Sequence, residues 1–149
     1  MTAAGTDLNA VLPLFVYGTL CRGMANHARY LEGRTDSVVE AEIDGCIELV
    51  EEEHYSYLRP GPGIVKGELV FLSPGLFLST LAEIDRLEDF DPGDPATSLY
   101  LRQTCLARTI DGERISAWTY FWNRRERPGR LISSGDFRRE MHRVNARNG

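Results

Sequence analysis

A glutamate on the apolar face of a predicted helix is the residue best placed to do chemistry. The segment 76–88 is expected to be the longest helix, and Glu88 falls within its apolar stripe when residues are placed about 100° apart. Three residues form the stripe: Phe77, Leu81 and Ile84. Asp85 lies only at its edge. Burial would favour the neutral acid and raise the pKa of Glu88, as a general acid or base requires. The pattern also fits a helix that ends one turn earlier, with Glu88 in solvent.

The second candidate is the bend after the first predicted strand, Leu14–Tyr17. Gly18 interrupts the strand pattern, and Thr19 and Leu20 lead toward a predicted helix over Met24–Glu32. Backbone N–H groups at such a bend bind anions or a developing oxyanion, and glycine lets a ligand approach the backbone closely. An ordinary connection between a strand and a helix fits the same residues.

Three neighbouring groups offer other chemistry. Cys21 and His27 would suit a thiol hydrolase, but their spacing does not place them on one helix face, and His27 is better explained as a residue that caps or packs the first helix. Arg22 either holds a carboxylate or is solvated. The run Glu51–His54 is expected to be a solvated turn rather than a metal site, because consecutive side chains of an extended chain point to opposite sides.

Both strands and helices are needed to position these candidate residues. The predicted strands cover 14–17, 38–50, 64–72, 99–110 and 113–122, and the predicted helices cover 24–32, 76–88 and 137–144. Ser73 is expected to cap the long helix, and Ser134 or Asp136 the last one. Asp111-Gly112 predicts a two-residue hairpin, and the run 60–63 predicts a rigid loop.

Glycine and aromatic residues add detail to this arrangement. Gly45 interrupts its strand as a bulge would, and Gly67 leaves space for a neighbouring group. The strand that ends at Trp122 is apolar on both faces, which indicates a central strand or the wall of a closed barrel. We expect one domain over 14–144, with a mobile lead over 1–13 and a polar tail over 145–149.

The composition excludes several classes of protein. The formal net charge of −5 over 149 residues argues against a nucleic-acid binder. No apolar run reaches the roughly 18 residues that span a bilayer, and the N-terminus lacks a secretory pattern. The 3 cysteines are widely spaced and suggest free thiols in the reducing cytoplasm.

Three stretches together resemble the γ-glutamylcyclotransferase-like superfamily, in the branch with γ-glutamylamine cyclotransferases and AIG2-like proteins. They occur in the family's order and are Val16-Tyr17-Gly18-Thr19-Leu20 with Arg22-Gly23 and Asn26-His27, then Val65, Gly67 and Glu68, then Ile84-Asp85-Arg86-Leu87-Glu88 with Tyr100 and Arg102. The chain departs from the family at Asp89, where a glycine is common, and in a longer loop over 89–99, which affects the shape of the pocket more than the chemistry.

The resemblance implies an α+β fold, a small and mostly antiparallel β-barrel flanked by a few helices, and no metal or organic cofactor. It implies that Glu88 is the catalytic acid and base, and that Tyr17, Gly18, Thr19 and Leu20 hold a γ-glutamyl group, with Tyr100 beside it. The α-amino nitrogen of such a substrate would attack its own γ-carbonyl, releasing 5-oxoproline and an amine. The alternative is a non-catalytic binder of similar ligands. We expect a small-molecule substrate as partner, and a monomer or weak homodimer.

Overall fold

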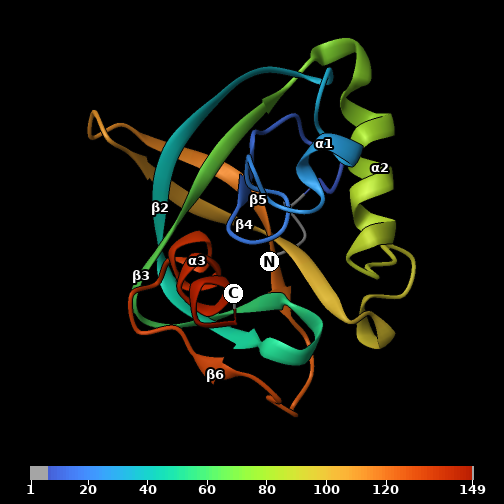
Figure 1. The fold of residues 1–149 in the computed structure, drawn as a ribbon. Coiled ribbons are helices and arrows are strands. Elements are labelled where there is room, and N and C mark those ends of the chain that lie inside the picture. The colour runs from blue at the N-terminus through green and yellow to red at the C-terminus, as the bar shows by residue number, and fades with distance from the viewer. Residues whose placement is uncertain (1–6, 149) are drawn as a thin grey trace.

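The computed structural model describes residues 7–148, and its helices are interspersed among the strands along the chain (Figure 1). The strands are β1 (Leu14–Val16), β2 (Thr35–Val50), β3 (Tyr55–Leu72), β4 (Tyr100–Thr109), β5 (Arg114–Trp122) and β6 (Arg130–Leu131). The helices are α1 (His27–Tyr30), α2 (Phe77–Leu87) and α3 (Phe137–Asn148), with 3₁₀ turns at Glu51–Glu53, Pro74–Leu76 and Pro95–Thr97.

Five of the strands close a barrel, as the α+β prediction required. Antiparallel pairs join β1 to β3, β3 to β2, β2 to β4 and β4 to β5. A parallel bridge between Leu14 and Trp118 joins β5 back to β1, which makes the barrel mixed but mostly antiparallel. The short β6 adds to β2 outside this ring. Closure leaves few exposed strand edges, which limits edge-to-edge association.

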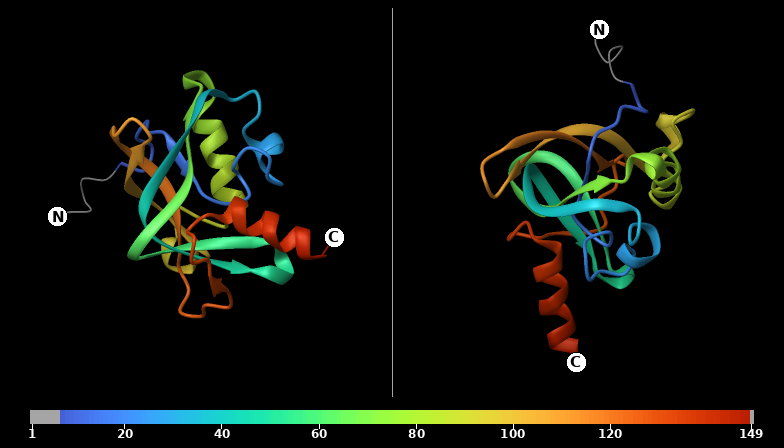
Figure 2. Two further views of the ribbon diagram at one scale, coloured as in Figure 1. Left: turned by 60° about the vertical axis from the view of Figure 1, so that its left-hand side comes forward. Right: turned by 90° about the horizontal axis from the view of Figure 1, so that it is seen from above.

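Two apolar clusters hold α2 and α3 against the barrel. The two helices lie on different sides of it (Figure 2). Alternate residues of β1 point to opposite sides, so Leu14 and Val16 join the cluster that contains the apolar stripe of α2, whereas Phe15 joins the cluster that contains one face of α3. Trp118 and Tyr120 of β5 lie in the first cluster, and Ala117 in the second. The prediction that β5 is apolar on both faces is therefore confirmed.

Glycine explains two close approaches between strands. A Cβ atom on Gly67 would lie 2.1 Å from the Val16 carbonyl oxygen, so β1 can pair with β3 only because this residue has no side chain. Gly45 marks a shift of register between β2 and β3, as expected of a bulge. The predicted loop over 60–63 is instead part of β3. These residues have no partner on β2, because the register shifts there at Gly45.

Several local predictions were wrong at element ends. The first helix covers only His27–Tyr30, because the preceding residues form turns. The hairpin loop has three residues, because Thr109 pairs with Glu113 and Gly112 takes a left-handed φ of 87°. Ser73 bonds Asp36 rather than capping α2. The Asp136 carboxylate caps α3 at the N–H of Arg139, 3.2 Å away, as one of the two predictions had it.

Both ends of the described chain pack against the fold. The backbone carbonyl of Ala10 accepts a hydrogen bond from the Trp118 indole, and that of Leu8 accepts one from Arg102. The last helix continues to Asn148, beyond the predicted limit at 144, while residues 1–6 and 149 of the predicted lead and tail lie outside the described residues. Within residues 7–148, no helix has the length and apolar character needed to cross a bilayer.

Candidate active site

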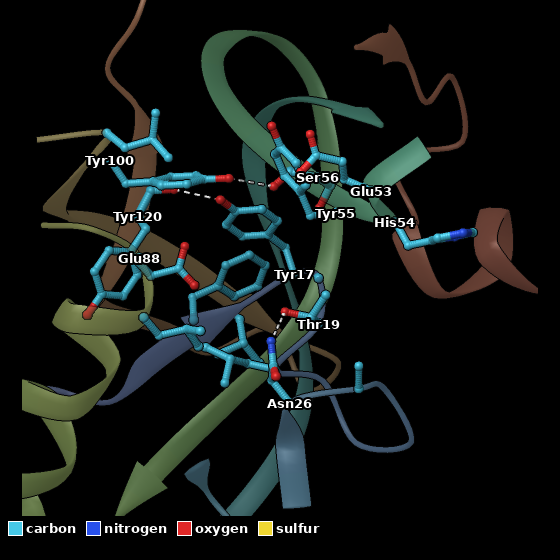
Figure 3. Close-up of a pocket in the computed structure, with 17 residues that line it drawn as sticks. Tyr17, Thr19, Asn26, Glu53, His54, Tyr55, Ser56, Glu88, Tyr100 and Tyr120 are labelled. Atoms are coloured by element: carbon cyan, nitrogen blue, oxygen red, sulfur yellow. Dashed lines mark hydrogen bonds between the residues drawn. The ribbon is translucent and has the colours of Figure 1, made fainter. Parts of the chain in front are cut away.

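One pocket collects the predicted catalytic residue and the predicted substrate-binding residues. Its cavity volume is about 460 Å³, and its walls come from the bend after β1, the start of β3, the end of α2 and the strands β4 and β5 (Figure 3). The six predicted residues all line it: Tyr17, Gly18, Thr19, Leu20, Glu88 and Tyr100. The structure therefore brings the acidic residue and the bend together, although they are far apart in the sequence.

Glu88 is aimed into the pocket by the end of its helix. It is the C-cap of α2, and Asp89 follows with a left-handed φ of 54°. The Phe90 N–H donates to the Asp85 carbonyl at 2.8 Å and the Asp89 N–H to the Arg86 carbonyl at 3.2 Å, which are the two bonds of a Schellman motif. Asp89 thus occupies the position just after the helix, where glycine is most common. Because the motif closes at this residue, α2 extends as far as its C-cap Glu88 and does not end one turn earlier.

The Glu88 carboxyl group has a pKa near neutrality. Burial raises its pKa from 4.5 to about 7, and the neighbouring Asp85 carboxylate adds to the rise. The side chain is half-buried, and Figure 3 shows its carboxyl group facing Tyr17 across the pocket. A carboxyl group with this pKa is present in both protonation states at pH 7 and can accept and return a proton.

Asp85 is a second buried carboxylate of α2, although it lies only at the edge of the apolar stripe, so the expectation of a single inward carboxylate was wrong. It is 6% exposed and makes a bidentate ion pair with Arg102 on β4, with N···O distances of 2.8 and 3.1 Å. The Tyr120 hydroxyl also donates to it at 2.5 Å. The rotation of α2 alone could not reveal this pair, because its partners lie on strands that follow the helix. The pair places a charged group directly behind Glu88.

Two of the pocket tyrosines, Tyr17 and Tyr100, are held by backbone carbonyls. The Tyr17 hydroxyl donates to the Tyr120 carbonyl at 2.8 Å, and the Tyr100 hydroxyl donates to the Ser56 carbonyl at 3.0 Å. Burial raises the pKa of both phenols well above the ordinary value, and Glu88 adds to the rise for each. Both side chains are therefore neutral, fixed walls of the site.

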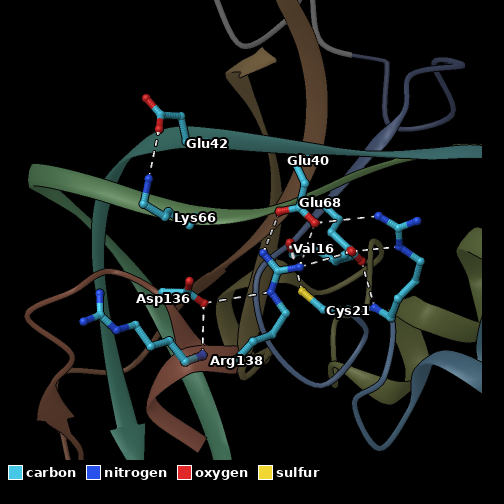
Figure 4. A network of polar contacts seen from close by, with 10 residues as sticks. Val16, Cys21, Glu40, Glu42, Lys66, Glu68, Asp136 and Arg138 are labelled. Carbon is cyan, nitrogen blue, oxygen red and sulfur yellow. Dashed lines mark hydrogen bonds and ion pairs between the residues drawn. The ribbon is translucent and has the colours of Figure 1, made fainter. Parts of the chain in front are cut away.

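The bend is anchored by Glu68, which is 1% exposed on β3 (Figure 4). Its carboxylate accepts from the backbone N–H and the Nε of Arg22, each at 2.8 Å. Arg138 of α3 reaches the same carboxylate at 3.2 Å and also pairs with Glu40 at 2.9 Å. Arg22 thus holds a carboxylate of the protein itself, and the ion-pair cluster fixes the end of the Gly18–Leu20 bend.

Cys21 and His27 do not form a catalytic pair. Cys21 is fully buried with its thiol directed at the Val16 carbonyl, 3.5 Å away, and burial raises the pKa of the thiol to about 12. The His27 Nδ1 instead contacts the Leu20 carbonyl at 2.9 Å. His27 therefore supports the bend rather than capping or packing the first helix as predicted, and the raised pKa keeps the Cys21 thiol protonated at neutral pH.

Sequence reasoning missed the pocket wall formed at the start of β3. Glu53 and His54 lie at the exposed side of the pocket, and Tyr55 and Ser56 line it. The run 51–54 was interpreted only as a solvated turn. The left-handed His54, with φ of 56°, turns the chain so that the next strand enters the site. Strand β3 began too late in the prediction for Tyr55 and Ser56 to be considered.

Comparison with known proteins agrees with this geometry. Residues 14–139 match the family model described as gamma-glutamyl cyclotransferase, AIG2-like. The chain is 37% identical over 113 residues to the gamma-L-glutamyl-butirosin B gamma-glutamyl cyclotransferase of Niallia circulans, covering 74% of this chain and 67% of that protein. It is 31% identical over 133 residues to a putative gamma-glutamylcyclotransferase of Methanocaldococcus jannaschii, covering 84% and 94%.

A solved structure shares the fold. An uncharacterised protein from Pyrococcus horikoshii superimposes with a TM-score of 0.61 at 28% identity, covering 89% of this chain and 97% of that one. The fold, a small mixed β-barrel with flanking helices, is that of γ-glutamyl cyclotransferase-like proteins. The chain belongs to the AIG2-like γ-glutamyl cyclotransferase family.

Proposed function

We propose that this protein cyclises γ-glutamyl amides, releasing 5-oxoproline and a free amine. One observation carries the proposal: the Glu88 carboxyl group, with a pKa of about 7, lines the same pocket as the Gly18–Leu20 bend. The named relative from Niallia circulans, which acts on a γ-glutamyl compound, supports the same substrate class.

The proposed reaction needs one proton acceptor that later becomes a donor. The ionised Glu88 carboxylate takes a proton from the α-ammonium group of the substrate, and the resulting amine attacks the γ-carbonyl carbon. A five-membered lactam forms through a tetrahedral intermediate. The carbon–nitrogen bond to the leaving amine then breaks as Glu88 returns the proton to that nitrogen. The ring nitrogen still carries a second proton from the ammonium group, and the ionised Glu88 takes this proton and passes it to the released amine, which departs as an ammonium ion. The nucleophile belongs to the substrate, so the protein need not supply one.

Positioning provides the rest of the rate enhancement. The γ-glutamyl chain must be folded so that its two ends meet, and a rigid pocket supplies that geometry before the reaction. Backbone N–H groups of the bend would hold the α-carboxylate or stabilise the oxyanion of the intermediate. The Glu68 cluster keeps the bend in place while this happens.

The activity is expected to increase with pH around neutrality. Because Glu88 acts first as a base, kcat/KM should rise as pH increases through about 7 and then reach a plateau. The proposed reaction uses the Glu88 carboxyl group and the substrate's own amino and carbonyl groups.

The proposed location of the protein is the cytoplasm. The thiols of Cys21, Cys46 and Cys105 are all free, which supports a place in the reducing cytoplasm.

The decisive experiment measures 5-oxoproline release from γ-glutamylamines, γ-glutamyl amino acids and glutathione. Native protein should release 5-oxoproline and amine in equal amounts from at least one of them. The Glu88→Gln variant should lose at least about 100-fold in kcat, the lower end of the effect of general acid–base catalysis. Glu113→Gln, on the exposed hairpin, is the matched control and should keep full activity. Binding of these compounds without release would support a non-catalytic binder and reject the proposal.

A further inference from the structure

The hydroxyl group of Ser56 has no role in holding the fold together. Ser56 is 7% exposed, lies at the start of β3 and lines the pocket, yet its Oγ atom has no hydrogen-bond partner among the described residues. Its backbone is used: the carbonyl accepts the Tyr100 hydroxyl at 3.0 Å (Figure 3). A buried polar group without a partner costs about 1–3 kcal/mol, so such a group within a pocket indicates a ligand.

This hydroxyl lies directly against Gly18 of the bend. A Cβ atom built on Gly18 would be 2.8 Å from the Ser56 Oγ, and no other heavy atom would come within 4 Å. Gly18 is also absent from the residues with a left-handed φ, so backbone conformation does not require a glycine here. The Ser56 hydroxyl is therefore what excludes a larger residue from position 18.

The bend beside this hydroxyl has backbone N–H groups that lack hydrogen-bond acceptors. Its carbonyls are occupied, since Gly18 accepts from the Cys21 N–H at 3.0 Å and Thr19 accepts from the Asn26 N–H at 2.8 Å. By contrast, the N–H groups of Gly18, Thr19 and Leu20 donate to no acceptor within residues 7–148. The Ser56 hydroxyl and the three residues with unpaired backbone donors thus line the same pocket as Glu88. Figure 3 shows Ser56 and Thr19 on the side of that pocket away from Glu88.

We propose that Ser56 is a substrate-binding residue whose hydroxyl donates a hydrogen bond to an oxygen atom of the bound γ-glutamyl group, alongside the bend. The proposal rests on the function proposed above and adds a recognition group to it. The acceptor is either the α-carboxylate or the γ-carbonyl oxygen, and both are oxygen acceptors that such donors recognise. Ser56 is not a nucleophile, because its Oγ contacts no base that could activate it.

The test compares Ser56→Ala with native protein in two measurements: the Kd for 5-oxoproline by calorimetry, and kcat and KM for a γ-glutamyl amide that the native protein turns over. If the acceptor is the α-carboxylate, the Kd and KM should both rise by roughly 10-fold or more while kcat is kept. If the acceptor is the γ-carbonyl oxygen, kcat should fall by roughly 100-fold while the Kd changes less.

Thr80→Val is the matched control. Thr80 carries the other buried hydroxyl without a partner, but it lies on α2, is 1% exposed and does not line the pocket. Its Kd, KM and kcat should stay within twofold of native. If Ser56→Ala also stays within twofold in all three constants, the Ser56 proposal fails and the cyclotransferase proposal stands. If native protein neither binds 5-oxoproline nor releases it from any substrate, both proposals fail.

A second pair of variants tests the geometry without using activity. Gly18→Ala should lower the melting temperature of the native chain, because the new methyl group must displace the Ser56 hydroxyl. In the Ser56→Ala background that oxygen is gone, so Gly18→Ala should lower the melting temperature much less. Equal losses in the two backgrounds would show that the hydroxyl does not lie over Gly18 and would overturn the proposal.

Discussion

A raised pKa at Glu88 has a consequence for stability as well as for catalysis. Its pKa is 4.5 in the unfolded chain and about 7 in the fold, so the folded protein binds the proton more tightly. Stability is therefore highest below pH 4.5, falls as pH rises from 4.5 to about 7, and is constant above that for this group. Each pKa unit corresponds to about 1.4 kcal/mol, so ionising Glu88 in the fold costs at most about 3 kcal/mol.

The Glu88→Gln variant removes this cost because glutamine does not ionise. At pH 8 we expect the variant to be more stable than native protein by up to about 3 kcal/mol, or on the order of 5–10 °C in melting temperature. At pH 4 the two proteins should be nearly equal, because native Glu88 is then protonated in both folded and unfolded chains. Taking the difference between the two proteins cancels the titration of every other carboxylate.

Urea unfolding at pH 4, 6 and 8 measures this difference directly. Glu113→Gln serves again as the control and should show the same small effect at every pH, because its side chain is exposed. A Glu88→Gln variant that is less stable than native protein at pH 8, or whose stability difference does not change between pH 4 and 8, would refute the reasoning. The carboxyl group would then be solvated, with an ordinary pKa.

Three further variants test the surroundings of this site. Asp85→Asn should move the midpoint of the kcat/KM profile to lower pH, because a negative charge that raises the pKa of Glu88 is removed; an unchanged midpoint would contradict this. Gly67→Ala should cost about 3 kcal/mol or more in urea unfolding, because its Cβ would meet the β1 backbone, whereas Gly75→Ala, with no atom within 4 Å, should be nearly neutral. Asp89→Gly should stabilise the protein by up to about 1 kcal/mol, since glycine removes the left-handed strain; a lower melting temperature would reject that assignment.

The sequence predicted the features that depend on local pattern. The apolar stripe of α2 placed Glu88 on the inward face, and the alternation along β5 indicated a barrel wall, because side-chain direction follows from helix and strand periodicity. Gly67 was expected to leave space for a neighbouring group, and the β1 backbone fills that space. At Gly18 the neighbour is the Ser56 hydroxyl, and the predicted approach of a ligand to this glycine remains a prediction. The catalytic and binding roles assigned to these residues remain predictions.

Features that depend on long-range pairing could not be obtained in this way. Asp85 looked peripheral because its partner Arg102 lies on a later strand, and only the closed barrel brings the two within 2.8 Å. Ser56 gave no signal, since a serine after a charged turn is ordinary in any loop. The length of the hairpin loop at Gly112 could not be predicted either. The dipeptide Asp111-Gly112 correctly predicted a turn, but the number of loop residues depends on which strand residues pair.

The pairing of β1 also determines at which stage of folding the pocket forms. Within the part of the chain that the structure describes, this three-residue strand pairs with β3 and β5 alone. It leads into the Gly18 bend, and Trp118 of β5 is far along the chain. Contacts so distant in sequence form late, because the intervening chain must first be ordered. A nascent chain that lacks β5 cannot shape the bend. During refolding, enzyme activity should therefore return only with the slowest phase that buries Trp118, and no partly folded intermediate should carry it.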